Sequence, residues 1–101
     1  MNDLERKLLQ NFIDDVKYAK DNYGYNATMF MRMISEQGPV GAAKSLIRKD
    51  VVSSGFVRLW ECRRLDLTVE ATILKEEYFP LFTDEEREMC KNRLKEYGYI
   101  I

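Results

Sequence analysis

The segment GFVRLWECRRLDLTVEATIL, residues 55–74, decides the fold of this chain. Its apolar residues recur at spacings of three and four, the pattern of one helical face. The Leu-Asp-Leu-Thr sequence at its centre predicts that one helix ends and another begins there, because Asp66 or Thr68 can cap the following helix. The pattern therefore predicts two short helices, with the following side chains in the core: Phe56, Leu59, Trp60, Val69 and Ile73.

The residues before this segment predict three further helices. An apolar stripe indicates a long helix over about residues 3–23, which Gly24 ends. Asn26 can cap a second helix, and Pro39 suits the first turn of a third, where its missing N–H would be unpaired in any case. Ser53-Ser54 can cap the helix inside segment 55–74. The side chains expected to face inward from the second and third helices are Met29, Phe30, Met33, Ile34, Val40, Ala42, Ala43, Leu46 and Ile47.

The clearest local signal lies near the C-terminus, in the sequence Thr83-Asp84-Glu85-Glu86. Thr83 and Glu86 have the spacing of a capping box, in which each side chain bonds to the other residue's backbone N–H. The helix that follows is expected to end at Gly98, and the apolar tail, residues 99–101, is expected to pack against the domain. Together these signals predict an all-α fold. We expect one compact domain, residues 1–101, built from five or six short helices.

The composition limits the classes to which this chain can belong. Its 101 residues are 46% hydrophobic and 33% charged, which is typical of a single globular domain. No apolar run approaches the roughly 20 residues that a membrane span needs, and the N-terminus lacks the apolar region of a signal peptide. Cys62 and Cys90 are too far apart for a metal-binding or redox pair. We therefore expect reduced thiols, a cytoplasmic location and no contact with a membrane.

The chain contains no histidine, which argues against an enzyme. Activation of a serine or cysteine nucleophile commonly requires histidine, and histidine is also the commonest zinc ligand. No glycine-rich phosphate-binding motif and no calcium-binding loop occurs in the sequence. The carboxylates Glu61, Asp66 and Glu70 would suggest catalysis only if they lay unpaired in a cleft. We predict no catalytic residue, no metal site and no cofactor.

Charge is distributed unevenly along the chain, although the net charge is only −1. Residues 44–64 contain six basic and two acidic residues, whereas residues 65–101 contain five basic and nine acidic residues. Either the acidic part neutralises the basic part within the fold, or helices three and four share a basic face that binds a partner. The candidate partner-binding surface consists of Lys44, Arg48, Lys49, Arg58, Glu61, Arg63 and Arg64.

Several short sequences together resemble an uncharacterised bacterial helical domain family, found alone or appended to larger proteins. They are YNAT at 25–28, GPVGAAKSLI at 38–47, SGF at 54–56, LWE at 59–61, RLDLTVEA at 64–71, LFT at 81–83 and YGY at 97–99. The similar region spans about residues 25–99, and Pro39 stands where the family pattern has a second glycine. The resemblance implies a helical fold and a bacterial or phage origin. It implies no catalytic residues, because the family has no established activity.

Two functions are compatible with these observations. The first is a non-enzymatic protein-interaction domain, acting as an accessory, adaptor or inhibitor subunit, with another protein as its partner. The alternative is a nucleic-acid-associated module that binds the phosphate backbone through the basic residues in segment 44–64. The balanced total charge favours the first, because a dedicated DNA-binding domain carries a basic excess. The sequence leaves the oligomeric state open.

Overall fold

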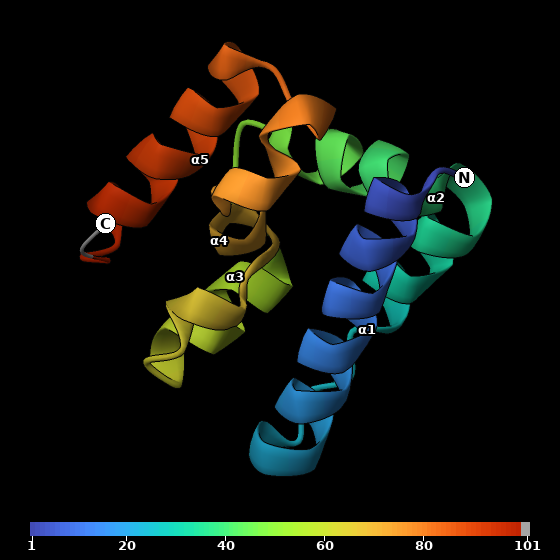
Figure 1. The fold of residues 1–101 in the computed structure, drawn as a ribbon. Coiled ribbons are helices and arrows are strands. Elements are labelled where there is room, and N and C mark those ends of the chain that lie inside the picture. The colour runs from blue at the N-terminus through green and yellow to red at the C-terminus, as the bar shows by residue number, and fades with distance from the viewer. Residues whose placement is uncertain (100–101) are drawn as a thin grey trace.

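The computed structural model describes residues 1–99, and this part of the chain is all-α, without a β-strand. Five α-helices and two 3₁₀ helices follow one another along it (Figure 1). Their bounds are α1 (Asp3–Tyr23), α2 (Thr28–Ile47), α3 (Ser54–Glu61), η1 (Leu65–Leu67), α4 (Val69–Ile73), η2 (Glu76–Leu81) and α5 (Asp84–Glu96). The prediction of a compact all-α domain is confirmed.

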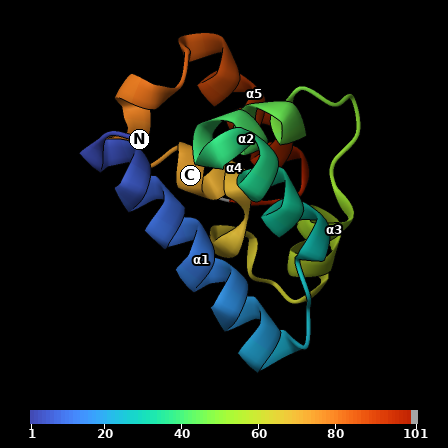
Figure 2. The same cartoon turned by 90° about the vertical axis from the view of Figure 1, so that its right-hand side faces the viewer.

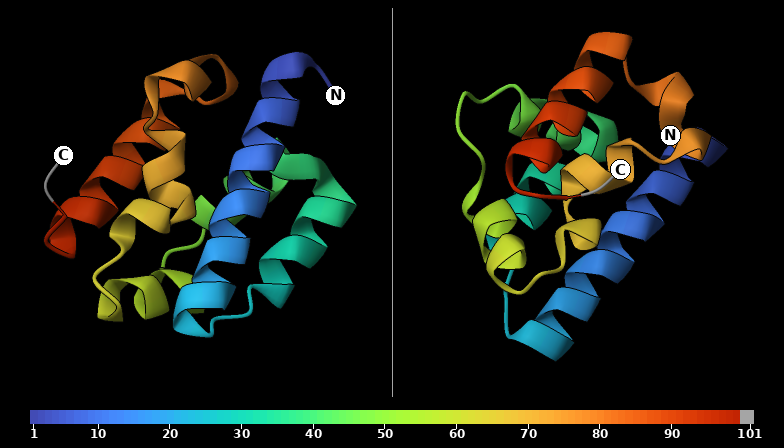
Figure 3. Two further views of the ribbon diagram at one scale, coloured as in Figure 1. Left: turned by 60° about the horizontal axis from the view of Figure 1, so that its bottom comes forward. Right: turned by 90° about the vertical axis from the view of Figure 1, so that its left-hand side faces the viewer.

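The other helices surround α4, the shortest of the α-helices. Helix α1 and the first half of α2 form an antiparallel pair, and α5 lies on the other side of α4 (Figure 3). Helix α4 contacts α1, α5, η1 and η2. The connection between α2 and α3 loops out on the side of the molecule opposite α1 (Figure 2). A five-residue helix thus becomes the centre of the packing, because both ends of the chain fold over it.

Most helix ends lie where the sequence predicts them. Helix α1 spans Asp3–Tyr23 and ends at Gly24, which is left-handed with φ 66°. Ser53 caps α3 and Thr68 caps α4 through their side-chain oxygens. Thr83 and Glu86 form both hydrogen bonds of the predicted capping box. The N-terminal caps are predictable because each joins residues only three positions apart, and the end at Gly24 is predictable because glycine readily adopts the left-handed conformation.

Helix α2, Thr28–Ile47, consists of the two helical segments that were predicted, carried under one label. They meet at Gly38, whose φ of 77° and ψ of 171° are not helical. Pro39 then begins the second half, as expected of a residue without a backbone N–H. Asn26 does not cap this helix, because its N-cap residue is Ala27. The kink joins two helical segments without an intervening loop.

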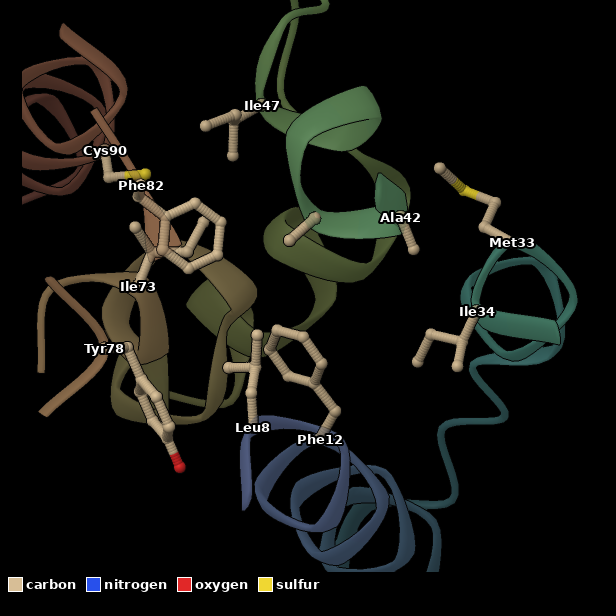
Figure 4. Close-up of a cluster of buried hydrophobic side chains, with 11 residues drawn as sticks. Leu8, Phe12, Met33, Ile34, Ala42, Ile47, Ile73, Tyr78, Phe82 and Cys90 are labelled. Atoms are coloured by element: carbon tan, nitrogen blue, oxygen red, sulfur yellow. The ribbon is translucent and has the colours of Figure 1, made fainter. Parts of the chain in front are cut away.

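The core consists of two clusters. The larger draws side chains from α1, α2, α4, η2 and α5 (Figure 4). It contains Leu8, Phe12, Met33, Ile34, Ala42, Ala43, Ile47, Ile73, Tyr78, Phe82 and Cys90. The smaller contains Phe56, Leu65 and Leu94, and Leu74 packs against both clusters. The apolar residue Tyr99 packs on the smaller cluster, whereas Ile100 and Ile101 lie outside the described residues.

Two predicted core residues lie at the surface instead. Trp60 is 44% exposed, and its indole N–H donates to the backbone carbonyl of Tyr97 at 3.1 Å. Met29 is 68% exposed, because α2 is rotated so that Phe30 packs edge-on against Phe12. Val69 is only partly buried. Helical spacing alone did not distinguish the centre of the apolar face from its border.

Within residues 1–99, no helix combines the length and apolar character needed to cross a bilayer.

Cys62 and Cys90 are free cysteines. Burial raises the pKa of the Cys90 thiol to about 12, so this thiol stays protonated at neutral pH. Cys90 is fully buried and Cys62 is partly buried.

Candidate functional site

The basic residues predicted to share one face lie at two ends of the molecule. Lys44 and Arg48 lie near the start of α5, whereas Arg58 and Arg64 both contact Tyr23 at the end of α1. Figure 1 shows the start of α5 at the top and the end of α1 at the bottom. These four basic residues therefore lie in two separate pairs, Lys44 with Arg48 and Arg58 with Arg64, and not on one continuous surface.

The first pair neutralises a carboxylate in the capping box. Lys44 and Arg48 approach the two oxygens of Glu86 at 3.3 and 3.6 Å, and only 7% of the Glu86 side chain is exposed. Burial opposes ionisation of Glu86, but the backbone N–H of Thr83 and the Lys44 ammonium outweigh it, so the pKa of this carboxyl lies below its ordinary value. This pair thus links α2 to α5.

The second pair fastens α3 and η1 to the end of α1. Arg64 forms a two-pronged ion pair with Asp66, with both distances 3.0 Å, and also donates to the hydroxyls of Tyr18 and Tyr23. Its hydrogen bonds hold the pKa of Asp66 below the ordinary value. Arg58 donates to the backbone carbonyl of Tyr23 at 2.9 Å. The guanidinium groups of Arg58 and Arg64 thus donate hydrogen bonds to other residues of the chain.

Three members of the predicted surface remain without a side-chain hydrogen bond or ion pair to any of residues 1–99: Lys49, Glu61 and Arg63. Lys49 uses its backbone carbonyl to accept a hydrogen bond from Arg93. Its side chain helps to line a pocket that the sequence did not predict. This pocket offers a second place where a partner could bind.

The pocket has a volume of about 280 Å³ and lies among α1, the first half of α2, the 49–53 connection, α3 and α4. Apolar side chains dominate its lining. They include Phe12, Val16, Met29, Phe30, Met33, Leu46, Val51, Val52, Phe56, Leu59, Leu67 and Val69. Met29 and Val51 are 68% and 73% exposed, so the pocket reaches the surface at these two residues.

Tyr25 shapes the pocket where α3 begins. Its hydroxyl lies against Gly55, so closely that a Cβ at position 55 would come within 2.6 Å of it. A larger residue at position 55 would therefore require the Tyr25 hydroxyl to shift, so glycine favours close packing here. Gly55 belongs to the segment that first indicated the fold, but its contact with Tyr25 depends on the tertiary structure.

The two carboxylates that line the pocket are held by structural partners. Asp15 accepts hydrogen bonds from Asn11 at 2.9 Å and from Thr72 at 3.3 Å. Glu70 is 1% exposed and lies 3.5 Å from Arg93. Burial raises the pKa of both carboxyls. These contacts hold α4 against α1 and α5. Of the three carboxylates considered for catalysis, Glu70 and Asp66 are paired.

Sequence reasoning missed the pocket because it treated all apolar residues of the first α2 segment as one buried stripe. The available signal was the run Val51-Val52 in a connection between helices, since apolar residues in a loop need something to cover them.

Within residues 1–99, no cluster of three or more acidic or cysteine side chains is arranged to hold a metal ion. No protein-family model, no curated protein and no solved structure matches this chain.

Proposed function

We propose that this chain is a non-enzymatic protein-interaction domain, an accessory, adaptor or inhibitor subunit of a bacterial or phage system. The apolar pocket with the exposed side chains of Met29 and Val51 carries this proposal. Two free cysteines fit a reducing compartment such as the cytoplasm. The proposed partner is a protein that inserts apolar side chains into this pocket.

The size and chemistry of the pocket support a protein partner. A volume of about 280 Å³ lies just below the range of typical small-molecule sites, roughly 300–1,000 Å³, and suits one or two apolar side chains. Burying one such side chain contributes roughly 1.5–3 kcal/mol. Met29 is well suited to the rim, because its flexible thioether can adapt to the shape of a partner. The pocket thus has the properties of an anchor site in a protein interface.

The alternative, binding to a nucleic-acid backbone, has less support. A backbone-binding face needs several cations directed toward solvent together. Lys44 and Arg48 lie at one end of the molecule and are paired with Glu86, and Arg64 is paired with Asp66. A gel shift at low salt distinguishes the two functions, because phosphate contacts weaken steeply as salt rises.

The pocket is tested by placing a charge at its mouth. Met29→Glu and Val51→Glu should both fold, because their side chains are mostly exposed. Met89→Glu is the matched control, since Met89 is 37% exposed on α5 and does not line the pocket. The proposal requires that a protein captured by the wild-type chain from a bacterial lysate is also captured by the control.

Capture should then be lost, at least tenfold, in both pocket variants, and circular dichroism should show equal helicity in all four proteins. If both pocket variants capture the same protein as efficiently as the wild type, the pocket is not the binding site. Salt-sensitive binding to an oligonucleotide, with no protein captured, would favour the alternative.

A further inference from the structure

Helices α3 and α5 end in the same arrangement of hydrogen bonds, a Schellman motif. In each, the residue after the C-cap is left-handed and two backbone N–H groups fold back onto the last turn. Glycine occupies the left-handed position after α1 and α5, with φ of 66° and 85°. The closing bonds of the two motifs are Arg64 N–H to Leu59 O and Tyr99 N–H to Leu94 O, whereas at the end of α1 the N–H of Gly24 bonds to Lys20 O.

After α3 the left-handed position belongs to Arg63, with φ 59°, the only non-glycine residue with positive φ in residues 1–99. A Cβ makes this conformation unfavourable, so glycine would suit the position better. The Arg63 side chain is exposed and forms no hydrogen bond or ion pair with the described residues that could offset the strain. Strained positions of this kind cluster at functional sites.

The Arg63 side chain lines a second pocket, of about 220 Å³, beside the exposed tryptophan. The lining consists of Trp60, Arg63, Leu65, Tyr97, Gly98 and Tyr99. Among these described residues Arg63 is the only one with a charge, and most of the others are aromatic or aliphatic. The pocket therefore places one cation beside three aromatic residues, Trp60, Tyr97 and Tyr99.

The aromatic wall is held in place before any ligand binds. The Trp60 ring is fixed by its hydrogen bond to the Tyr97 carbonyl and packs edge-on against the Tyr97 ring, with centroids 5.4 Å apart. Tyr97 in turn packs edge-on against Phe56, which is 2% exposed, at 4.9 Å. A ring anchored to the core in this way loses little freedom on binding.

We propose that this second pocket binds a segment of a partner protein that carries an aspartate or glutamate beside an apolar side chain. The guanidinium of Arg63 pairs with the carboxylate in a two-pronged geometry, and the apolar side chain packs against Trp60 and Leu65. Tryptophan, tyrosine and arginine are the residues enriched at the energetic centres of protein interfaces. The inference rests on the proposed function as a protein-interaction domain, but not on the pocket beside Met29.

The charge around the pocket favours an acidic peptide over nucleic acid. Arg64, the neighbouring cation, is occupied by Asp66 at 3.0 Å. One available cation can pair with one carboxylate, whereas a phosphate backbone presents a series of charges that need several cations. Stacking of a base on Trp60 without such support would be weak at physiological salt.

The test uses a displayed library of random dodecapeptides, selected in parallel on the wild-type chain and on Arg63→Gly. This substitution removes the guanidinium and places the favoured residue at the left-handed position, so the variant should fold. We expect Asp or Glu next to Leu, Ile or Phe to be enriched at least tenfold on the wild type but not on the variant. Synthetic versions should change the fluorescence of Trp60, the only tryptophan in the chain.

Matched peptides with Asn or Gln in place of the acid should bind the wild type at least tenfold more weakly and should not distinguish it from Arg63→Gly. No acidic enrichment, equal binding to both proteins, or a less stable Arg63→Gly protein would each overturn the inference. Lower stability would mean that the guanidinium already has a partner within the chain. Selection on Met29→Glu separates the two proposals, because acidic enrichment should persist there even if the larger pocket has no partner.

Discussion

The guanidinium of Arg93 on α5 lies 3.5 Å from the carboxylate of Glu70 on α4, with 12% and 1% of the two side chains exposed. Arg93 also donates a hydrogen bond to the backbone carbonyl of Lys49. One side chain therefore connects α4, α5 and the segment that follows α2. This segment leads into the wall of the larger pocket, so the ion pair supports the candidate binding site from behind.

Replacing Arg93 by methionine should destabilise the fold strongly. The change leaves the buried Glu70 without its cation, and removing one partner of a buried ion pair typically costs about 3–5 kcal/mol. The double variant Glu70→Gln/Arg93→Met is the matched control and should recover part of the loss, because no unpaired charge remains. Urea unfolding measures the free energy of unfolding of the single and the double variant. Equal values for the two would show that Glu70 and Arg93 are not energetically coupled.

Glu70 should also make stability depend on pH. Burial raises its pKa in the fold above the ordinary 4.5, so the folded chain retains a proton that the unfolded chain has released. The stabilising contribution of the neutral carboxyl is complete below pH 4.5 and is lost as the pH rises through the folded-state pKa.

The measurement is the free energy of unfolding of the wild type minus that of Glu70→Gln, between pH 4 and 8. This difference should fall as the pH rises and then become constant. A difference that increases with pH over the same interval would contradict the assigned direction.

The capping box at the start of α5 should contribute measurably. Thr83→Ala removes the acceptor for the Glu86 N–H and should cost about 1 kcal/mol, as losses of such caps typically do. Thr83→Ser retains the hydroxyl and should stay within a few tenths of a kcal/mol of the wild type. Thermal unfolding followed by circular dichroism compares the three proteins.

Arg63→Gly should stabilise the chain by about 0.5–1 kcal/mol, because glycine adopts the left-handed conformation without the clash of a Cβ. Gly98→Ala is the matched control at the equivalent position of α5, and Gly24→Ala tests the left-handed glycine that ends α1. Both should lose stability by a similar amount, since no neighbouring atom lies within 4 Å of the added Cβ and only the backbone strain changes. Stability lost in all three variants would contradict this account of the motif.

The helix ends were largely predictable, and the contacts between helices were not. Gly24, Ser53, Thr68 and the Thr83–Glu86 pair act through hydrogen bonds to residues nearby in the chain, so their roles can be inferred from spacing. The exposure of Trp60 and Met29 was predicted wrongly, because it depends on how neighbouring helices are rotated. The uneven charge along the sequence was a correct observation, but it did not indicate which charges would be paired.

The sequence by itself determined an all-α chain, the ends of most of its helices and the left-handed glycines that stop two of them. These features follow from local sterics and from hydrogen bonds that close within one turn. Only the tertiary structure decided that Lys44 and Arg48 pair with Glu86, and that Arg63 lies beside Trp60 without an ion pair to any of residues 1–99. The reason is physical: an ion pair or a pocket depends on distances between segments far apart in the chain, and packing alone fixes those distances.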